Sequence, residues 1–236
     1  MNPRNLTRLL LAVLTLGLAA CEDATGPPGI ALLLQVEVIS SAAAPTGVSP
    51  ARGPAPAPGI ESIDIGEVAL ALGGLELTAS TINGREDFLL EEPVVVPLRL
   101  SGDPTLALST PVPTDEYQSI DVFVDKLDPG VPADDVLIEV FPSLEGASVL
   151  IRGTFVRDGV EELFAFSSPL SARRQYVFPA PRRFSSTFRS VALYTLTIEL
   201  DGWFDAGFGE LLDPTDPADQ ADIEANISAS LELVQG

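Results

Sequence analysis

Residues 201–222, DGWFDAGFGELLDPTDPADQAD, hold the densest run of side chains that could bind a metal ion. Carboxylate oxygens are the ligands that calcium prefers, and the candidate ligands are Asp201, Asp205, Glu210 and Asp213. Their spacing does not match the regular alternation of an EF-hand loop. Asp216 before Pro217 instead suits a helix N-cap, with Asp219 in the first turn. Two interpretations therefore stay open: a calcium site, or solvated acids of turns and a helix cap.

Two further groups of side chains could bind a ligand. Trp203 and Phe204 could form an aromatic platform for a sugar or a peptide, or close the end of a β core, and we favour the core. The segment 173–184, RRQYVFPAPRRF, could bind an anionic ligand or partner, because guanidinium groups pair with carboxylates and phosphates. Its arginines are Arg173, Arg174, Arg182 and Arg183. Charge compensation within an acidic domain is the interpretation we favour for them.

Several catalytic chemistries are excluded by the residues that the chain lacks. It contains no histidine, which removes Ser-His-Asp and Cys-His nucleophile pairs and histidine zinc sites. Lys126 is the only lysine, and the residue three positions before it is Phe123, so no Ser-x-x-Lys motif exists. An enzyme would have to use a carboxylate pair, as glycosidases do. We expect a protein that is not an enzyme and has no cofactor.

The N-terminus, MNPRNLTRLLLAVLTLGLAAC, has the layout of a secretory signal peptide over residues 1–20. The apolar run Leu9–Ala20 has 12 residues, too few to cross a hydrocarbon core of about 30 Å as a helix. Leu18-Ala19-Ala20-Cys21 resembles the bacterial lipobox. The resemblance implies cleavage before Cys21, a diacylglycerol on its sulfur and an acylated amine. Residues 21–29 would then be the lipidated cysteine and a short tether.

The predicted location is the bacterial cell envelope, with the protein attached to a membrane through Cys21. We expect the outer membrane, facing the periplasm or the cell surface. Removal of residues 1–20 deletes two of the 13 basic residues and none of the 34 acids, so the formal charge changes from −21 to 11 − 34 = −23. Such a charge repels nucleic acid. The partner would be a protein or a glycan.

The rest of the chain is typical of an all-β fold, and we predict one antiparallel β-sandwich domain over residues 30–236. Within it, residues 41–59 are expected to form a flexible Ala/Pro/Gly-rich loop. Ile63 and Ile65 alternate with polar residues until Gly66 shifts the phase, as a β-bulge would. Asp158-Gly159 predicts a two-residue hairpin turn. We expect seven to nine strands.

The C-terminus fits two periodicities. Ile223, Ile227, Leu231 and Val234 have helical spacing, whereas Ile227, Ala229, Leu231 and Leu233 have strand spacing. The cap at Asp216 favours a short C-terminal helix.

The later half resembles a group of uncharacterised bacterial lipoproteins that carry a domain of unknown function. The resemblance rests on VLIRGTFVRDGVEELFAFSSPL (149–170), DGWFDAGFGELLDP and DIEANISASLEL, and it covers residues 60–236. It implies an immunoglobulin-like or transthyretin-like β-sandwich and carries over no catalytic residues.

Three functions follow as hypotheses. The first is a lipid-anchored, non-catalytic β-sandwich protein that acts as a binding or interaction module. The second is a calcium-stabilised adhesion or carbohydrate-binding module, and the third is a carboxylate-dependent glycoside hydrolase.

Overall fold

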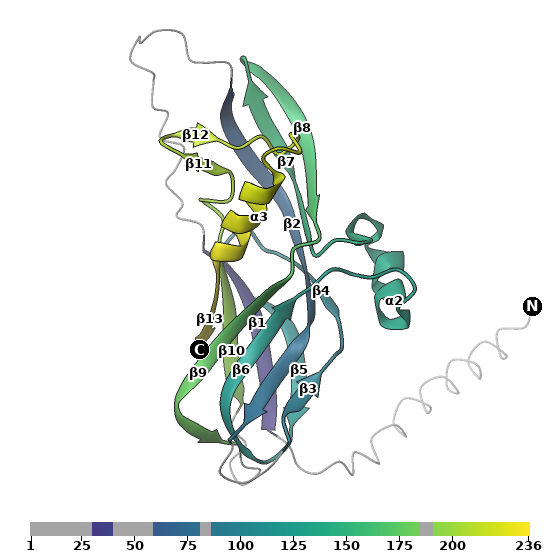
Figure 1. The fold of residues 1–236 in the computed structure, drawn as a ribbon, viewed down its shortest axis with the longest axis vertical. Coiled ribbons are helices and arrows are strands. Elements are labelled where there is room, and N and C mark those ends of the chain that lie inside the picture. Colours follow the sequence, from purple (N-terminus) through teal and green to yellow (C-terminus); the bar gives the residue numbers. More distant parts are fainter. Residues whose placement is uncertain (1–29, 40–58, 81–85, 185–190) are drawn as a thin grey trace, which may run out of the picture.

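The computed structural model describes residues 30–39, 59–80, 86–184 and 191–236 (Figure 1). Strands dominate these residues: β1 (Ile30–Ile39), β2 (Ile60–Ala79), β3 (Phe88–Leu90), β4 (Val94–Pro97), β5 (Thr105–Val112), β6 (Glu116–Val124), β7 (Val149–Arg157), β8 (Val160–Ser168), β9 (Ala172–Arg183), β10 (Ala192–Glu199), β11 (Asp205–Gly207), β12 (Glu210–Leu211) and β13 (Leu231–Gln235). The helices are α2 (Pro132–Val140), the short 3-10 helix η2 (Pro142–Leu144) and α3 (Gln220–Ala229). The predicted all-β sandwich is confirmed.

The smaller sheet has the strand order β13-β10-β1-β5. Burial alternates along β1, so that Leu32, Leu34 and Val36 are buried between more exposed neighbours. β1 and β10 pair in parallel, from Leu32 beside Ala192 to Ile39 beside Glu199. This pair differs from the purely antiparallel sheet that we expected, because a parallel neighbour 160 positions along the chain leaves no local turn signal.

The larger sheet has the order β8-β7-β2-β6-β9, with β3 and β4 also paired to β2. β2 is 20 residues long, and its register against β7 shifts between Ile65 and Glu67, which confirms the bulge at Gly66. Asp158 and Gly159 have φ angles of 52° and 74°, as a two-residue hairpin turn between β7 and β8 requires. Within the described residues there are thirteen strands instead of seven to nine, because β3, β4, β11 and β12 are too short to show a periodicity.

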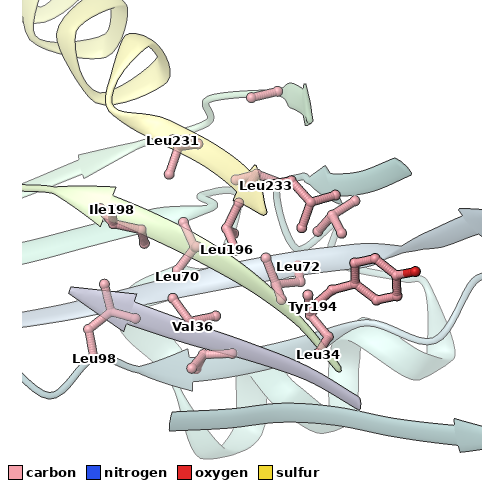
Figure 2. Packing of buried hydrophobic residues seen from close by; sticks show 14 of the residues in the cluster. Leu34, Val36, Leu70, Leu72, Leu98, Tyr194, Leu196, Ile198, Leu231 and Leu233 are labelled. Atoms are coloured by element: carbon pink, nitrogen blue, oxygen red, sulfur yellow. The ribbon is translucent and has the colours of Figure 1, made fainter. Parts of the chain in front are cut away.

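The main core lies between the two sheets (Figure 2). Leu34 and Val36 of β1, with Tyr194, Leu196 and Ile198 of β10, lie near Leu70 and Leu72 of β2 in the close-up. All seven side chains are at most 1% exposed. Hydrophobic burial on this scale is the main stabilising contribution to such a fold, since each fully buried aliphatic side chain contributes about 1.5–3 kcal/mol.

The other end of the larger sheet is covered differently. β2, β7 and β8 extend past the smaller sheet, and there α3 and the β11–β12 hairpin lie against them (Figure 1). Ile223 and Ile227 of α3 are fully buried in the same cluster as Phe155, Phe164 and Phe166. The molecule therefore has a two-sheet end, at which β1 starts, and a helix-covered end, at which residues 200–229 replace the second sheet.

The opposite face of the larger sheet carries a second, smaller cluster. Ala69, Ala71 and Leu150 are buried there with Leu144 of η2, and Leu137 of α2 packs against them. No helix in the described parts of the chain is long and apolar enough to cross a membrane.

The C-terminal segment forms both of the structures that its periodicities indicate. α3 follows the helical spacing of Ile223 and Ile227, and β13 follows the strand spacing of Leu231 and Leu233. The predicted start of the helix is wrong by several residues: Asp219 is the residue before the first turn. Asp216 Oδ1 accepts a hydrogen bond from the Ala218 N–H (2.8 Å), so Asp216 and Pro217 form a turn before the helix.

Candidate functional site

Residues 200–212 close the helix-covered end and carry most of the candidate side chains. Trp203 is 1% exposed and Phe204 5%, so both belong to the core, and neither ring is available as a platform for a sugar or a peptide. Phe204 makes edge-to-face contacts with Phe164 and Phe166 of β8, at centroid distances of 5.7 and 6.4 Å. The core interpretation of this aromatic pair therefore holds, and the platform interpretation does not.

Helix α3 fixes the backbone of this segment. Trp203 Nε1 donates to Ser230 Oγ (2.8 Å), and the Asn226 side-chain amide donates to the carbonyls of Trp203 (3.3 Å) and Asp205 (2.9 Å). The Leu212 N–H donates to the Phe204 carbonyl (2.8 Å). These bonds hold the base of the β11–β12 hairpin against the end of the core.

The four candidate calcium ligands do not meet at one point. Asp213 forms an ion pair with Arg157 of β7 and accepts from Thr215, and Asp205 Oδ1 accepts from the Gly207 N–H (2.7 Å). Asp201 and Glu210 are exposed. Across the described ranges, no three acidic, cysteine or histidine side chains are grouped so that they could hold a metal ion. The acids of this segment act in turns and in one ion pair, and calcium binding stays a prediction.

The hairpin tip presents a residue that we did not single out from the sequence. Phe208 has a relative exposure of 110%, the highest of the large hydrophobic residues in the described parts of the chain. Its φ of 59° lies between those of Gly207 (86°) and Gly209 (82°). The Gly-Phe-Gly triplet was the signal in the sequence, because two glycines around an aromatic residue indicate a tight turn that cannot bury it.

The four arginines of segment 173–184 do not form one binding patch. Arg174 donates to the carbonyls of Ser228 and Leu231, and so joins β9 to the end of α3 and the start of β13. Arg182 donates to the Tyr194 hydroxyl (3.2 Å), and Arg183 is exposed. Arg173 lies 2.7 Å from Asp121 and 3.6 Å from Glu76, measured between nitrogen and carboxylate oxygen. Three of the four are thus engaged within the protein.

Asp121 is the most buried acid in this cluster, with a side chain that is 0% exposed. Its second carboxylate oxygen accepts from the Gln175 amide (3.2 Å), and Arg173 also lies over the Phe123 ring at 5.5 Å. The hydrogen bond to Asp121 raises the pKa of Arg173, so its guanidinium stays charged. Ile120 and Val122 on either side of Asp121 belong to the main core, whereas Asp121 points to the other face of β6, toward Arg173 and Gln175 of β9.

A shallow hollow of about 690 Å³ lies at the bulge of β2. Its lining residues come from β2, β7 and β8: Gly66, Glu67, Arg152, Gly153, Thr154, Leu163, Phe164 and Ala165. Arg152 is paired with Glu67 (3.1 Å) and donates to Ser143 (2.7 Å). Arg152 and Glu67, the charged side chains of the hollow, are therefore already paired with each other.

Comparison of the chain with protein-family models, with curated proteins and with solved structures finds no match. The resemblance to lipoproteins with a domain of unknown function therefore stays a prediction, as does the immunoglobulin-like or transthyretin-like assignment. The signal peptide of residues 1–20, Cys21 with its tether (21–29), and all but the last residue of the predicted loop at residues 41–59 lie outside the described residues.

Proposed function

We propose that the chain is a lipid-anchored, non-catalytic binding module of the bacterial cell envelope. The observation that carries the proposal is the Leu18-Ala19-Ala20-Cys21 motif at the end of the apolar run Leu9–Ala20. A cysteine that carries more than one acyl chain attaches its protein stably, because burial of each methylene contributes about 0.8 kcal/mol. The strongly acidic sandwich behind it would be the part that meets a partner.

The position of β1 supports this arrangement. Eight residues separate Cys21 from Ile30, and an extended chain of that length spans at most about 26–29 Å. Ile30 is the first residue of β1, which pairs with β5 and β10 on its two sides. An anchor at Cys21 would therefore keep the two-sheet end of the molecule close to the membrane surface.

Detergent phase partitioning of the full chain, expressed in bacteria, tests the anchor. We expect the mature protein in the detergent phase, with an intact mass that begins at Cys21 and includes acyl chains. Cys21→Ser should abolish both, whereas Glu22→Gln should change neither. A wild-type protein that stays in the aqueous phase, with an unmodified Cys21, would contradict the proposal.

A further inference from the structure

The exposed ring of Phe208 does not contribute to the core of the protein. Its ring extends from the tip of the β11–β12 hairpin with a relative exposure of 110%, so it gains nothing from burial in the folded chain. Exposed large hydrophobic residues are common on proteins singly, but an exposed aromatic side chain on a tight turn has few intramolecular contacts to make. Exposure of one aromatic side chain is therefore not enough to identify an interface.

The backbone pays a conformational cost to hold a phenylalanine at this position. A φ of 59° is left-handed, a region that glycine and, less often, asparagine occupy readily. Bulky side chains that persist there cluster at functional sites. Glycine or asparagine would suit the turn better, so the folding of the hairpin does not account for the aromatic ring.

The base of the hairpin, in contrast, is firmly held. Asn226 donates to the Asp205 carbonyl before the tip, the Leu212 N–H after the tip donates to the Phe204 carbonyl, and Asp205 Oδ1 accepts from the Gly207 N–H. Trp203 and Phe204 fix the same segment in the core. A ring presented on such a base loses little conformational entropy when it binds, which is the property of an interface anchor.

A second observation is the charge around the tip. Residues 191–236 contain ten acids and no lysine or arginine. Arg157 of β7 neutralises Asp213, but Asp201, Asp205 and Glu210 are exposed in or beside the hairpin, and among the described residues no basic side chain forms an ion pair with them. Charges around an interface favour partners of opposite sign. The surface that receives Phe208 should therefore carry basic groups.

The hairpin also lies far from the start of the domain. β1 and β10 run in parallel, so the end of β1 at Ile39 lies beside Glu199, and the chain continues from there into the helix-covered end. Ile30 lies at the opposite end of β1, and β1 lies in the lower part of the molecule in Figure 1, whereas β11 and β12 lie in the upper part. With an anchor at Cys21, which is the proposed function, the hairpin points away from the anchoring membrane.

We propose that Phe208 inserts into an apolar pocket, rimmed by lysine or arginine, on a partner protein that meets the end of the sandwich remote from its own lipid anchor. Asp201 and Glu210 would face the basic rim, and the ring would fill the pocket. The net charge of the chain disfavours an anionic lipid surface or nucleic acid at the same place.

The test is site-specific photo-crosslinking of the full chain in the envelope of the bacterium that expresses it. A benzophenone amino acid replaces Ala206, which is exposed next to Phe208, and in a control it replaces Leu106 on β5. We expect a protein adduct from position 206 and not from position 106. Peptide mapping of this adduct should place the crosslink in the partner protein beside apolar residues and lysine or arginine.

Variants in the background of the Ala206 crosslinker separate the two features of the proposal. Phe208→Asn should reduce the adduct at least tenfold, and Asp201→Lys with Glu210→Lys should do the same. Glu91→Lys with Glu92→Lys, a charge reversal of equal size between β3 and β4, should leave it unchanged. Phe208→Asn should also raise Tm by a few degrees, because asparagine tolerates the left-handed backbone.

Several results would overturn the inference. The first is that no adduct forms, or that position 106 gives the same adduct. The second is that the adduct survives Phe208→Asn or the charge reversal at Asp201 and Glu210. The third is that the crosslinked molecule is a phospholipid or a second copy of this chain. A lower Tm for Phe208→Asn would show that the ring serves the fold instead. Failure of the anchor is a separate result: a wild type that stays aqueous in detergent partitioning and still forms the adduct contradicts only the proposed function.

Discussion

The two ends of this sandwich bury the same larger sheet in different ways. At the two-sheet end, aliphatic residues of β1 and β10 face those of β2, and both sides follow a period of two residues. At the helix-covered end, β2, β7 and β8 face α3 and residues 200–212, where Phe204 packs against Phe164 and Phe166. Aromatic rings pack at the two-sheet end as well, where Phe178 lies against Tyr194. A helix and an irregular segment fill the space that a second layer of strands fills elsewhere.

This difference separates two roles within one short segment. Trp203 and Phe204 complete the core, while Phe208, four residues further, is displayed. The division is possible because the segment turns back on itself at Gly207 and Gly209 and is held at its base by α3. An irregular segment that covers a sheet can therefore stabilise the fold with some of its side chains and present another side chain to a partner.

The largest effect should come from removal of the central ring of the helix-covered end. Trp203→Ala should lower the free energy of unfolding by about 3–5 kcal/mol, because it leaves a large cavity and removes the hydrogen bond to Ser230. Urea unfolding measures it, with Leu196→Ala at the two-sheet end as the comparison, expected at about 2–5 kcal/mol. A cost below 1 kcal/mol for Trp203→Ala would mean that residues 200–212 are not part of the core.

The close approach of β2 and β7 should be the next most sensitive point. A Cβ added at Gly153 would lie 2.0 Å from the Asp64 carbonyl oxygen and 2.9 Å from the Phe164 ring. Gly153→Ala should therefore cost about 3 kcal/mol, since backbone must move. Gly66→Ala is the matched control, because its Cβ would come no closer than 3.7 Å to the Arg152 carbonyl oxygen. Equal costs for the two variants would contradict this packing.

The ion pair on the outer face of β6 and β9 should have a moderate effect. Arg173→Ala removes the charged partner of the buried Asp121 and should cost about 2 kcal/mol, less than for a fully buried pair, because Arg173 is half exposed. Arg183→Ala should change the free energy of unfolding by less than about 0.5 kcal/mol, as is usual for an exposed side chain. If the two variants lose the same free energy of unfolding, the pairing of Arg173 with Asp121 does not stabilise the fold.

The smallest change at neutral pH should follow Tyr194→Phe, which affects stability at alkaline pH. Burial raises the pKa of Tyr194, and the nearby Arg182 only partly opposes this. The neutral hydroxyl is therefore favoured in the folded protein: its contribution is complete below the ordinary tyrosine pKa of about 10 and is lost as the pH rises through the folded value. Between pH 8 and pH 11, the free energy of unfolding should fall less steeply for Tyr194→Phe than for the wild type. Parallel curves would contradict this.

Local features of the fold were predictable from the sequence, and non-local ones were not. The bulge at Gly66 and the Asp158-Gly159 turn depend on neighbours in the chain, and both are confirmed. The parallel pairing of β1 with β10 depends on residues 160 positions apart. The start of α3 was misplaced because Asp216 can cap a turn as well as a helix.

The candidate site was less predictable for a related reason. The sequence shows an aromatic pair at Trp203 and Phe204 and many acids in residues 201–222. Whether these side chains are buried depends on the distant elements that cover them. Asp121 resembles any outward residue of a strand until Arg173 is placed beside it. Phe208 is distinguished from Phe204 by its turn: the glycines on both sides indicate a turn, but residue types alone do not show that the hairpin projects the ring away from the core.

Trp203 is buried and Phe208 is exposed, although both lie in the 200–212 segment, and the roles of the two ends of the molecule depend on this difference. Trp203 is the only tryptophan, so acrylamide quenching of its fluorescence measures its accessibility without interference. We predict weak quenching for the wild type and strong quenching for a Trp203→Phe, Phe208→Trp double variant, in which the tryptophan moves to the hairpin tip. Strong quenching of the wild type, or protection of the tryptophan at position 208, would contradict the account.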